Sequence, residues 1–188
     1  MGWMSRLVAA IAVVAAFGPL APSPAHATTA VMAPVAREAH AHLKEVGRGR
    51  LTFMGFGIYK TSLWSDTGKY AGLRAGQTLA LSLWYERKFT RSQLIAITTR
   101  EWQRLGLGNA EQQNRWTREL ERHWVDVRPG DNMTIVMTPE GETRFYRQDR
   151  ALGSVKDPQF GPALLAIWLD PRTAVADLRQ QMLGSDGA

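Results

Sequence analysis

The sequence contains no cysteine, and this absence excludes several classes of protein at once. The chain can form no disulfide framework, no thiol nucleophile and no lipid anchor on a cysteine. It also lacks the Gly-x-Ser-x-Gly, His-Glu-x-x-His and phosphate-binding glycine motifs that are typical of common hydrolases and nucleotide-binding enzymes. A hydrophobic core alone must therefore stabilise the fold, and the six tryptophans that follow residue 27, of seven in the sequence, supply large apolar surface for it.

Long hydrophobic runs are absent as well. Arg6 precedes an apolar stretch from Leu7 to Phe17, which is far shorter than the roughly 20 residues needed to span a bilayer. Ala25-His26-Ala27 offers an Ala-x-Ala cleavage site. We therefore expect residues 1–27 to be a signal peptide, which predicts a periplasmic or secreted protein with no transmembrane segment after cleavage.

The chain has no dense basic run, although its formal net charge is +6. Its arginines are scattered along the sequence, which favours a solvated basic surface. The excess positive charge would also allow weak contact with an anionic membrane surface. Because the protein is expected to be exported, we expect no nucleic acid among its partners.

One domain accounts for most of the mature chain, because no internal repeat or low-complexity linker divides it. We expect a lead-in over residues 28–45, or a short helix over 35–43 within it. The domain covers residues 46–184, and residues 185–188 form a tail.

Aromatic and β-branched residues predict the strands. Residues 50–64 are expected to form one strand, in which glycines mark bulges or close backbone approach. Residues 79–85 alternate with a period of two, residues 133–138 and 143–147 form a hairpin around Glu140-Gly141, and residues 151–155 add a short strand.

Capping boxes predict two paired helices between these strands. Thr90 with Gln93 begins the first, which ends at Gly106, and Asn109 with Gln112 begins the second. Trp116, Leu120 and Trp124 lie on one face of the second helix and are expected in the core. Asp157-Pro158 predicts the start of a third helix, and a fourth covers residues 173–183. The order of elements predicts an α+β fold with a mostly antiparallel sheet.

Several short motifs in the same order resemble the bacterial chalcone isomerase-like family. They cover residues 47–51 with Gly55, Tyr59 and Leu63-Trp64, then residues 127–131, 152–153, 157–160, 167–173 and 178–184. The resemblance implies an open-faced β-sandwich, in which helices pack on one face of a large, mostly antiparallel sheet.

The family resemblance also implies a binding site. Arg50, or Arg48 close to it, matches an arginine that helps to bind the ligand, and Tyr59 stands where the plant enzymes have a threonine. The family also has a tyrosine on a neighbouring strand. It aligns with Glu86 when Arg87 is matched to the family's arginine, or with Tyr85 if the alignment shifts by one residue. Such a shift decides which face of the sheet the side chain lies on. A negative Glu86 would disfavour a phenolate substrate.

We therefore expect an exported, non-catalytic protein that binds a small amphiphilic carboxylate, such as a fatty acid, in an apolar cleft. Arg50 would bind the carboxylate, Tyr59 and Tyr85 would add donors, and Phe53, Phe56 and Leu83 would form the walls. Alternatively, Arg50 pairs with Glu86 and orders the sheet.

Two other functions stay open. One is an intramolecular lyase that closes a ring on a chalcone-like phenolic compound, and the other is an envelope interaction module without a pocket. His40 and His42 form a His-x-His pair, but no third metal ligand lies near them in the sequence. We expect both histidines to be exposed, and we expect no metal and no cofactor.

Overall fold

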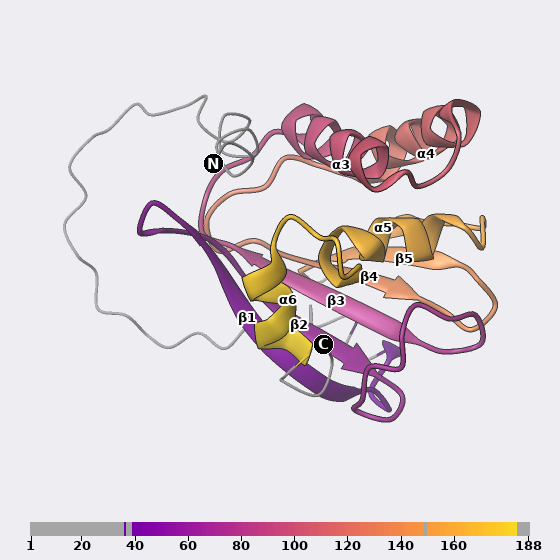
Figure 1. Cartoon of the computed structure of the whole chain (residues 1–188), viewed down its shortest axis with the longest axis horizontal. Helices are drawn as coiled ribbons and strands as arrows, with labels where there is room; N and C mark the ends of the chain where they lie inside the picture. Colours follow the sequence, from indigo (N-terminus) through magenta and orange to yellow (C-terminus); the bar gives the residue numbers. More distant parts are fainter. Residues whose placement is uncertain (1–35, 37–38, 149, 184–188) are drawn as a thin grey trace.

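A six-stranded antiparallel sheet, with strands in sequence order from β1 to β6, forms one layer of the molecule. The computed structural model describes residues 36, 39–148 and 150–183. The predicted signal peptide, most of the predicted lead-in and the predicted tail lie outside these residues. Figure 1 shows the helices gathered on one face of the sheet, so the predicted α+β architecture is confirmed.

The strands agree with the predicted ones except at the start of the domain. Their bounds are β1 Lys44–Phe53, β2 Phe56–Ser65, β3 Leu79–Tyr85, β4 Asn132–Met137, β5 Thr143–Arg147 and β6 Arg150–Val155. The prediction of one strand over residues 50–64 is wrong, because a tight turn at Met54-Gly55 divides it into β1 and β2. Both turn residues have positive φ, 49° and 81°, as a two-residue hairpin turn of type I′ requires.

The described ranges contain four helices, namely α3 Arg91–Leu105, α4 Ala110–His123, α5 Phe160–Leu169 and α6 Ala176–Leu183. Both predicted capping boxes are present, and Gly106 ends α3 with a φ of 70°. The helix predicted from Asp157-Pro158 begins later, at Phe160. Asp157 instead accepts hydrogen bonds from the Gln159 amide and from Trp116 Nε1, so its carboxylate fixes a turn before the helix.

The core is built around α5, which lies between the sheet and the α3–α4 pair (Figure 1). Nearly every residue of α5 is buried, as expected for a helix that is apolar all round. Trp102 and Trp116 pack against Phe160 at its start, with ring centroids 5.3 Å apart for the two tryptophans. The predicted burial of Trp116, Leu120 and Trp124 is confirmed.

One extra residue in β2 decides which side chains face the helices. Leu51 pairs with Tyr59 and Thr52 pairs with Gly57, so Ile58 has no partner on β1. At such a bulge two residues oppose one, and the alternation of side chains is broken. Ile58 and Tyr59 are therefore both directed toward the helices, whereas Gly57 lies on the opposite face.

Trp102 tests the importance of this core. Its side chain is fully buried and its Nε1 donates to the Ala163 carbonyl at 3.1 Å. We expect Trp102→Ala to lower the free energy of unfolding by about 3–5 kcal/mol in chemical denaturation, because it opens a large cavity. Trp102→Phe keeps much of the ring and should cost clearly less. A loss below about 1 kcal/mol for the alanine variant would contradict this role of Trp102.

Candidate functional site

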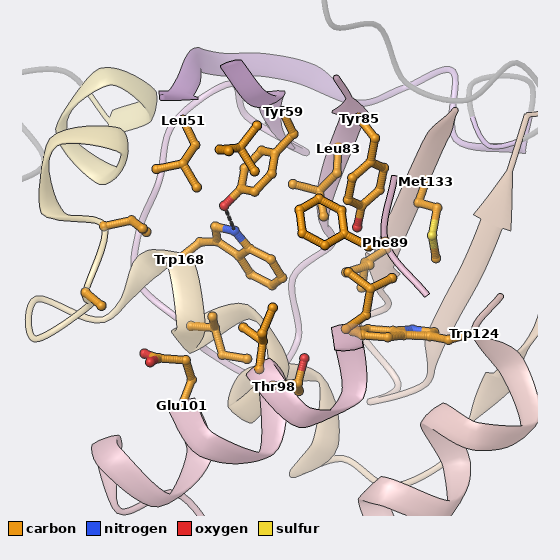
Figure 2. A pocket seen from close by; sticks show the side chains of 17 residues that line it. Leu51, Tyr59, Leu83, Tyr85, Phe89, Thr98, Glu101, Trp124, Met133 and Trp168 are labelled. Atoms are coloured by element: carbon orange, nitrogen blue, oxygen red, sulfur yellow. Dashed lines mark hydrogen bonds between the residues drawn. The ribbon is translucent and has the colours of Figure 1, made fainter. Parts of the chain in front are cut away.

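An apolar cavity of about 110 Å³ lies between the sheet and the helices. Its walls come from β1, β2, β3 and β4, from α3 and α5, and from the segments that join the elements (Figure 2). The lining side chains are mostly aliphatic or aromatic: Leu51, Ile58, Tyr59, Leu83, Tyr85, Phe89, Leu94, Ile97, Thr98, Glu101, Trp124, Met133, Ile135, Ile167, Trp168, Ala174 and Val175.

Two tyrosines from neighbouring strands face each other in this cavity. Tyr59 and Tyr85 are paired across β2 and β3, and their ring centroids are 6.1 Å apart. The Tyr59 hydroxyl accepts a hydrogen bond from Trp168 Nε1 at 3.0 Å (Figure 2). Burial raises the pKa of both phenols well above the ordinary value of 10, so both remain neutral donors at physiological pH.

Two hydroxyls in the cavity are available for hydrogen bonds to a bound molecule. Tyr85 and Thr98 are only 5% and 4% exposed, and Figure 2 shows both hydroxyls directed into the cavity. Among the described residues, neither hydroxyl has a hydrogen-bond partner. Neither oxygen is among the fully buried polar atoms without a partner, so water in the cavity can reach both hydroxyls, and a polar group on a bound molecule would replace that water.

Arg50 and Glu86 form a two-point ion pair away from the cavity. Arg50 Nε and Nη2 donate to the two Glu86 carboxylate oxygens at 2.9 and 3.0 Å. Arg50 precedes the cavity-lining Leu51, and adjacent strand residues point to opposite faces. A methyl group on Gly57 would collide with the pair, which places it on the face opposite the helices. The predicted pairing of Arg50 with Glu86 is present, and a ligand-binding role for Arg50 stays a prediction.

The other predicted site residues are divided between the two faces. Tyr85 faces the cavity while the next residue, Glu86, faces away, as the alternation of a strand requires. Arg48 binds Glu45 and is exposed. Leu83 lines the cavity as predicted, but Phe53 and Phe56 do not, so the prediction that these two phenylalanines form its walls is wrong.

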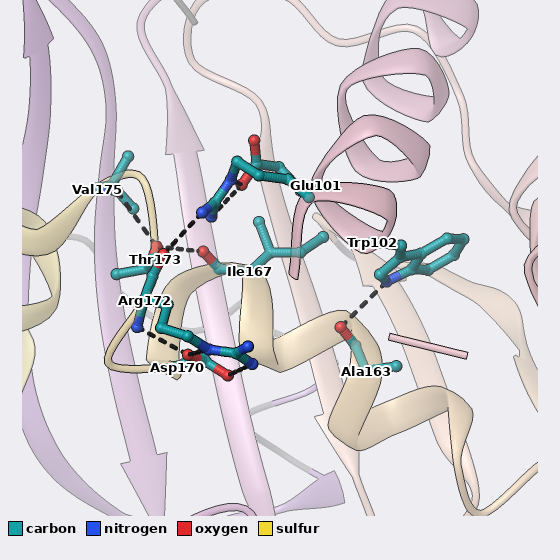
Figure 3. A network of polar contacts seen from close by, with 9 residues as sticks. Glu101, Trp102, Ala163, Ile167, Asp170, Arg172, Thr173 and Val175 are labelled. Carbon is teal, nitrogen blue, oxygen red and sulfur yellow. Dashed lines mark hydrogen bonds and ion pairs between the residues drawn. The ribbon is translucent and has the colours of Figure 1, made fainter. Parts of the chain in front are cut away.

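Sequence analysis missed the group that holds the segment between α5 and α6 beside the cavity. Arg104 binds the carboxylate of Glu101, a lining residue only 4% exposed, and donates to the Arg172 carbonyl at 2.8 Å. Within the segment, Thr173 donates to the Ile167 carbonyl and accepts from the Val175 amide (Figure 3). Glu101 and Arg104 are three residues apart on a predicted helix, and this spacing could have indicated that the two side chains form an ion pair.

No metal centre is found in the part of the chain that the structure describes, where no three potential ligands lie together. The prediction of two exposed histidines is wrong for His40, which is 7% exposed and lies 3.3 Å from the Tyr146 hydroxyl. Burial lowers the pKa of His40, with smaller contributions from Arg144 and His42. His42 is exposed and lies near Asp66.

A six-stranded antiparallel sheet covered on one face by helices, with an apolar cavity between the layers, defines an open-faced β-sandwich. The chain belongs to the chalcone isomerase-like family, whose sequence model matches residues 30–184. A crystal structure of a fatty-acid binding protein from Arabidopsis thaliana has the same fold, with a TM-score of 0.53 over 76% of this chain and 84% of that chain. The two sequences are 13% identical. A search of curated protein sequences finds no match.

Among the described residues, no helix is both long and apolar enough to cross a bilayer.

The unpaired Tyr85 hydroxyl generates a prediction about alkaline stability. In the unfolded chain a tyrosine ionises near pH 10, but the raised pKa in the fold keeps Tyr85 protonated. The folded state therefore loses stability as the pH rises above about 10, by up to about 1.4 kcal/mol per pH unit for each such group.

We expect Tyr85→Phe to leave stability at pH 7 within about 0.5 kcal/mol, and to reduce the alkaline loss. Urea denaturation of both proteins between pH 8 and pH 11 measures this difference. Parallel stability curves for the two proteins would show that Tyr85 does not titrate as a buried phenol.

Proposed function

We propose that the protein is a non-catalytic binding protein for a small amphiphilic molecule, with a carboxylate such as a fatty acid as the candidate ligand. The observation that carries this proposal is the cavity, whose lining is almost wholly apolar and contains two hydroxyls, of Tyr85 and Thr98, that no described residue hydrogen-bonds. Burial of an acyl segment there would contribute about 0.8 kcal/mol per methylene. An interaction module that has lost its pocket would have no reason to retain such a space.

The cavity volume limits the part of the ligand that it can enclose. A space of about 110 Å³ is somewhat smaller than an engineered cavity of about 150 Å³ that binds benzene. In proportion to its volume it therefore suits a segment of about four carbon atoms. A longer chain would extend past Ala174, an exposed residue that also lines the cavity.

The polar end of the ligand has two candidate binding groups. Arg50 is the one that the family resemblance implies, and a carboxylate bound there would have to replace Glu86 in the two-point pair. Tyr85 and Thr98 are the groups that the cavity itself offers. None of the described residues that line the cavity is a Lys, Arg or His, which favours a ligand whose charge stays outside it.

Chain length and cavity access give the decisive binding test. In calorimetric titrations with straight-chain acids, we expect affinity to rise about fourfold per methylene and to level off near the length that fills the cavity. Ala174→Trp should weaken binding at least tenfold, because an indole at the exposed rim blocks entry. Ala176→Trp is the matched control, since Ala176 is also exposed but does not line the cavity.

Equal affinities for Ala174→Trp and the unaltered protein would contradict binding in this cavity. Arg50→Ala then tells the two polar groups apart. A loss for the acid but not for the alcohol of equal length would assign the carboxylate to Arg50, and equal behaviour of both ligands would assign the polar end to Tyr85 and Thr98.

Ring closure on a chalcone-like phenol is the second candidate, because two neutral phenols line the cavity and could polarise a substrate carbonyl. Turnover of chalcones above the uncatalysed rate, and its loss in Tyr85→Phe, would favour this function over binding alone.

We also propose that the protein acts outside the cytoplasm after loss of residues 1–27. Support comes from the short apolar stretch and the Ala-x-Ala site in the sequence. N-terminal sequencing of the protein purified from its producing cell should give Thr28 as the first residue. A protein that retains its initial residues in the cytosolic fraction would contradict export.

A further inference from the structure

The turn between β1 and β2 exposes two large apolar side chains. Met54 is 78% exposed and Phe56 is 47% exposed, and they are the exposed large hydrophobic residues of the described chain. Both belong to the hairpin tip, which we define as residues 53–56. Figure 1 shows this tip projecting from the left side of the molecule, beyond the helices. An apolar pair on a projecting turn has no contribution to make to the core.

Met54 also stands where the backbone disfavours it. Its φ is 49° and that of Gly55 is 81°, and this type of turn strongly prefers asparagine, aspartate or glycine at both positions. A bulky residue at positive φ is strained. The folded protein thus exposes an apolar side chain at a position where a polar residue would be both more soluble and less strained, and such an outlier points to a functional contact.

Unpaired positive charge lies beside the hairpin tip. The Arg87 guanidinium lies 5.1 Å from the centre of the Phe56 ring, and Arg87 Nε donates to the Gly57 carbonyl at 3.2 Å. The bridge between Phe89 and Val127 brings exposed Lys88 and Arg128 opposite each other on the adjoining segments. Among the described residues, no carboxylate pairs with the side chain of Arg87, Lys88 or Arg128.

We propose that the hairpin tip docks on an anionic lipid bilayer. Met54 and Phe56 enter the interfacial region of the bilayer, while Arg87, Lys88 and Arg128 bind its anionic headgroups. This combination of an apolar wedge and surrounding cations is what interfacial binding requires, since burial and charge attraction add together. The net charge of +6, which becomes +5 when Arg6 is lost with residues 1–27, favours approach to such a surface.

Docking at this place would bring the cavity close to the membrane. Leu51 and Ile58 line the cavity and lie two residues before and after the hairpin tip in the chain. An amphiphile could then pass between the bilayer and the cavity over a short distance. Only this link to ligand exchange rests on the proposed function, and the docking itself does not depend on it.

Vesicle co-sedimentation tests the docking without any added ligand. The protein, in the form in which it is purified from its producing cell, is mixed with vesicles of phosphatidylcholine with or without phosphatidylglycerol. We expect binding to the anionic vesicles only, with affinity that falls as salt is raised.

Met54→Asn is the decisive variant, because asparagine suits the turn better and the fold should be as stable or more stable. We expect it to weaken vesicle binding about tenfold. Arg87→Gln with Lys88→Gln should weaken binding by roughly an order of magnitude or more. Arg115→Gln with Arg118→Gln removes the same net charge from exposed positions on α4, so it should keep most of the affinity.

Three results would overturn the proposal. One is absence of binding to anionic vesicles, and another is equal binding by Met54→Asn and the unaltered protein. The third is a loss of vesicle affinity in the α4 control as large as that of Arg87→Gln with Lys88→Gln. That result would show that only the overall charge of the protein matters. A monomer–dimer equilibrium that Met54→Asn abolishes, without vesicle binding, would instead assign the hairpin tip to a second copy of the chain. Failure of acid binding in the cavity would leave each of these vesicle results unchanged.

Discussion

The irregular pairing at Ile58 is the constraint on which the site depends. Because this residue is extra in β2, Ile58 and Tyr59 both contribute side chains to the cavity, while Gly57 leaves room on the opposite face for the pair of Arg50 and Glu86. A regular strand would have sent one of the two lining residues to the other side. The same irregularity thus builds one wall of the cavity and separates its neutral phenols from the charged pair.

This separation determines which chemistry the cavity can perform. Tyr59, Tyr85 and Thr98 offer neutral hydroxyls within an apolar enclosure, and Glu101 is already bound by Arg104. Neutral donors suit the uncharged or outermost part of an amphiphile, whereas a fully buried carboxylate would need a cation to offset its desolvation. The arrangement therefore favours binding through apolar contact, with the polar end meeting either the hydroxyls or the Arg50 guanidinium outside.

Much of the fold could be predicted from local patterns, because alternation in β3 and the capping boxes of α3 and α4 depend on neighbouring residues alone. The turn at Met54-Gly55 was not predicted, because methionine stands where the usual hairpin dipeptides have asparagine or aspartate. Burial of His40 depends on Tyr146, which lies far away in the sequence. The glycines of residues 50–64 indicated a bulge or a close backbone approach, as Gly57 confirms. They did not show which residue is extra, and the facing of Arg50 depends on that register.

A crystal structure of the protein grown with octanoic acid would test the central claim most directly. Binding in the cavity predicts continuous density for an acyl chain between Leu83, Trp124 and Trp168, with the chain end near Ala174. If that space stays empty or is filled by side chains, while the acid binds elsewhere or not at all, the assignment of this cavity as the functional site is contradicted.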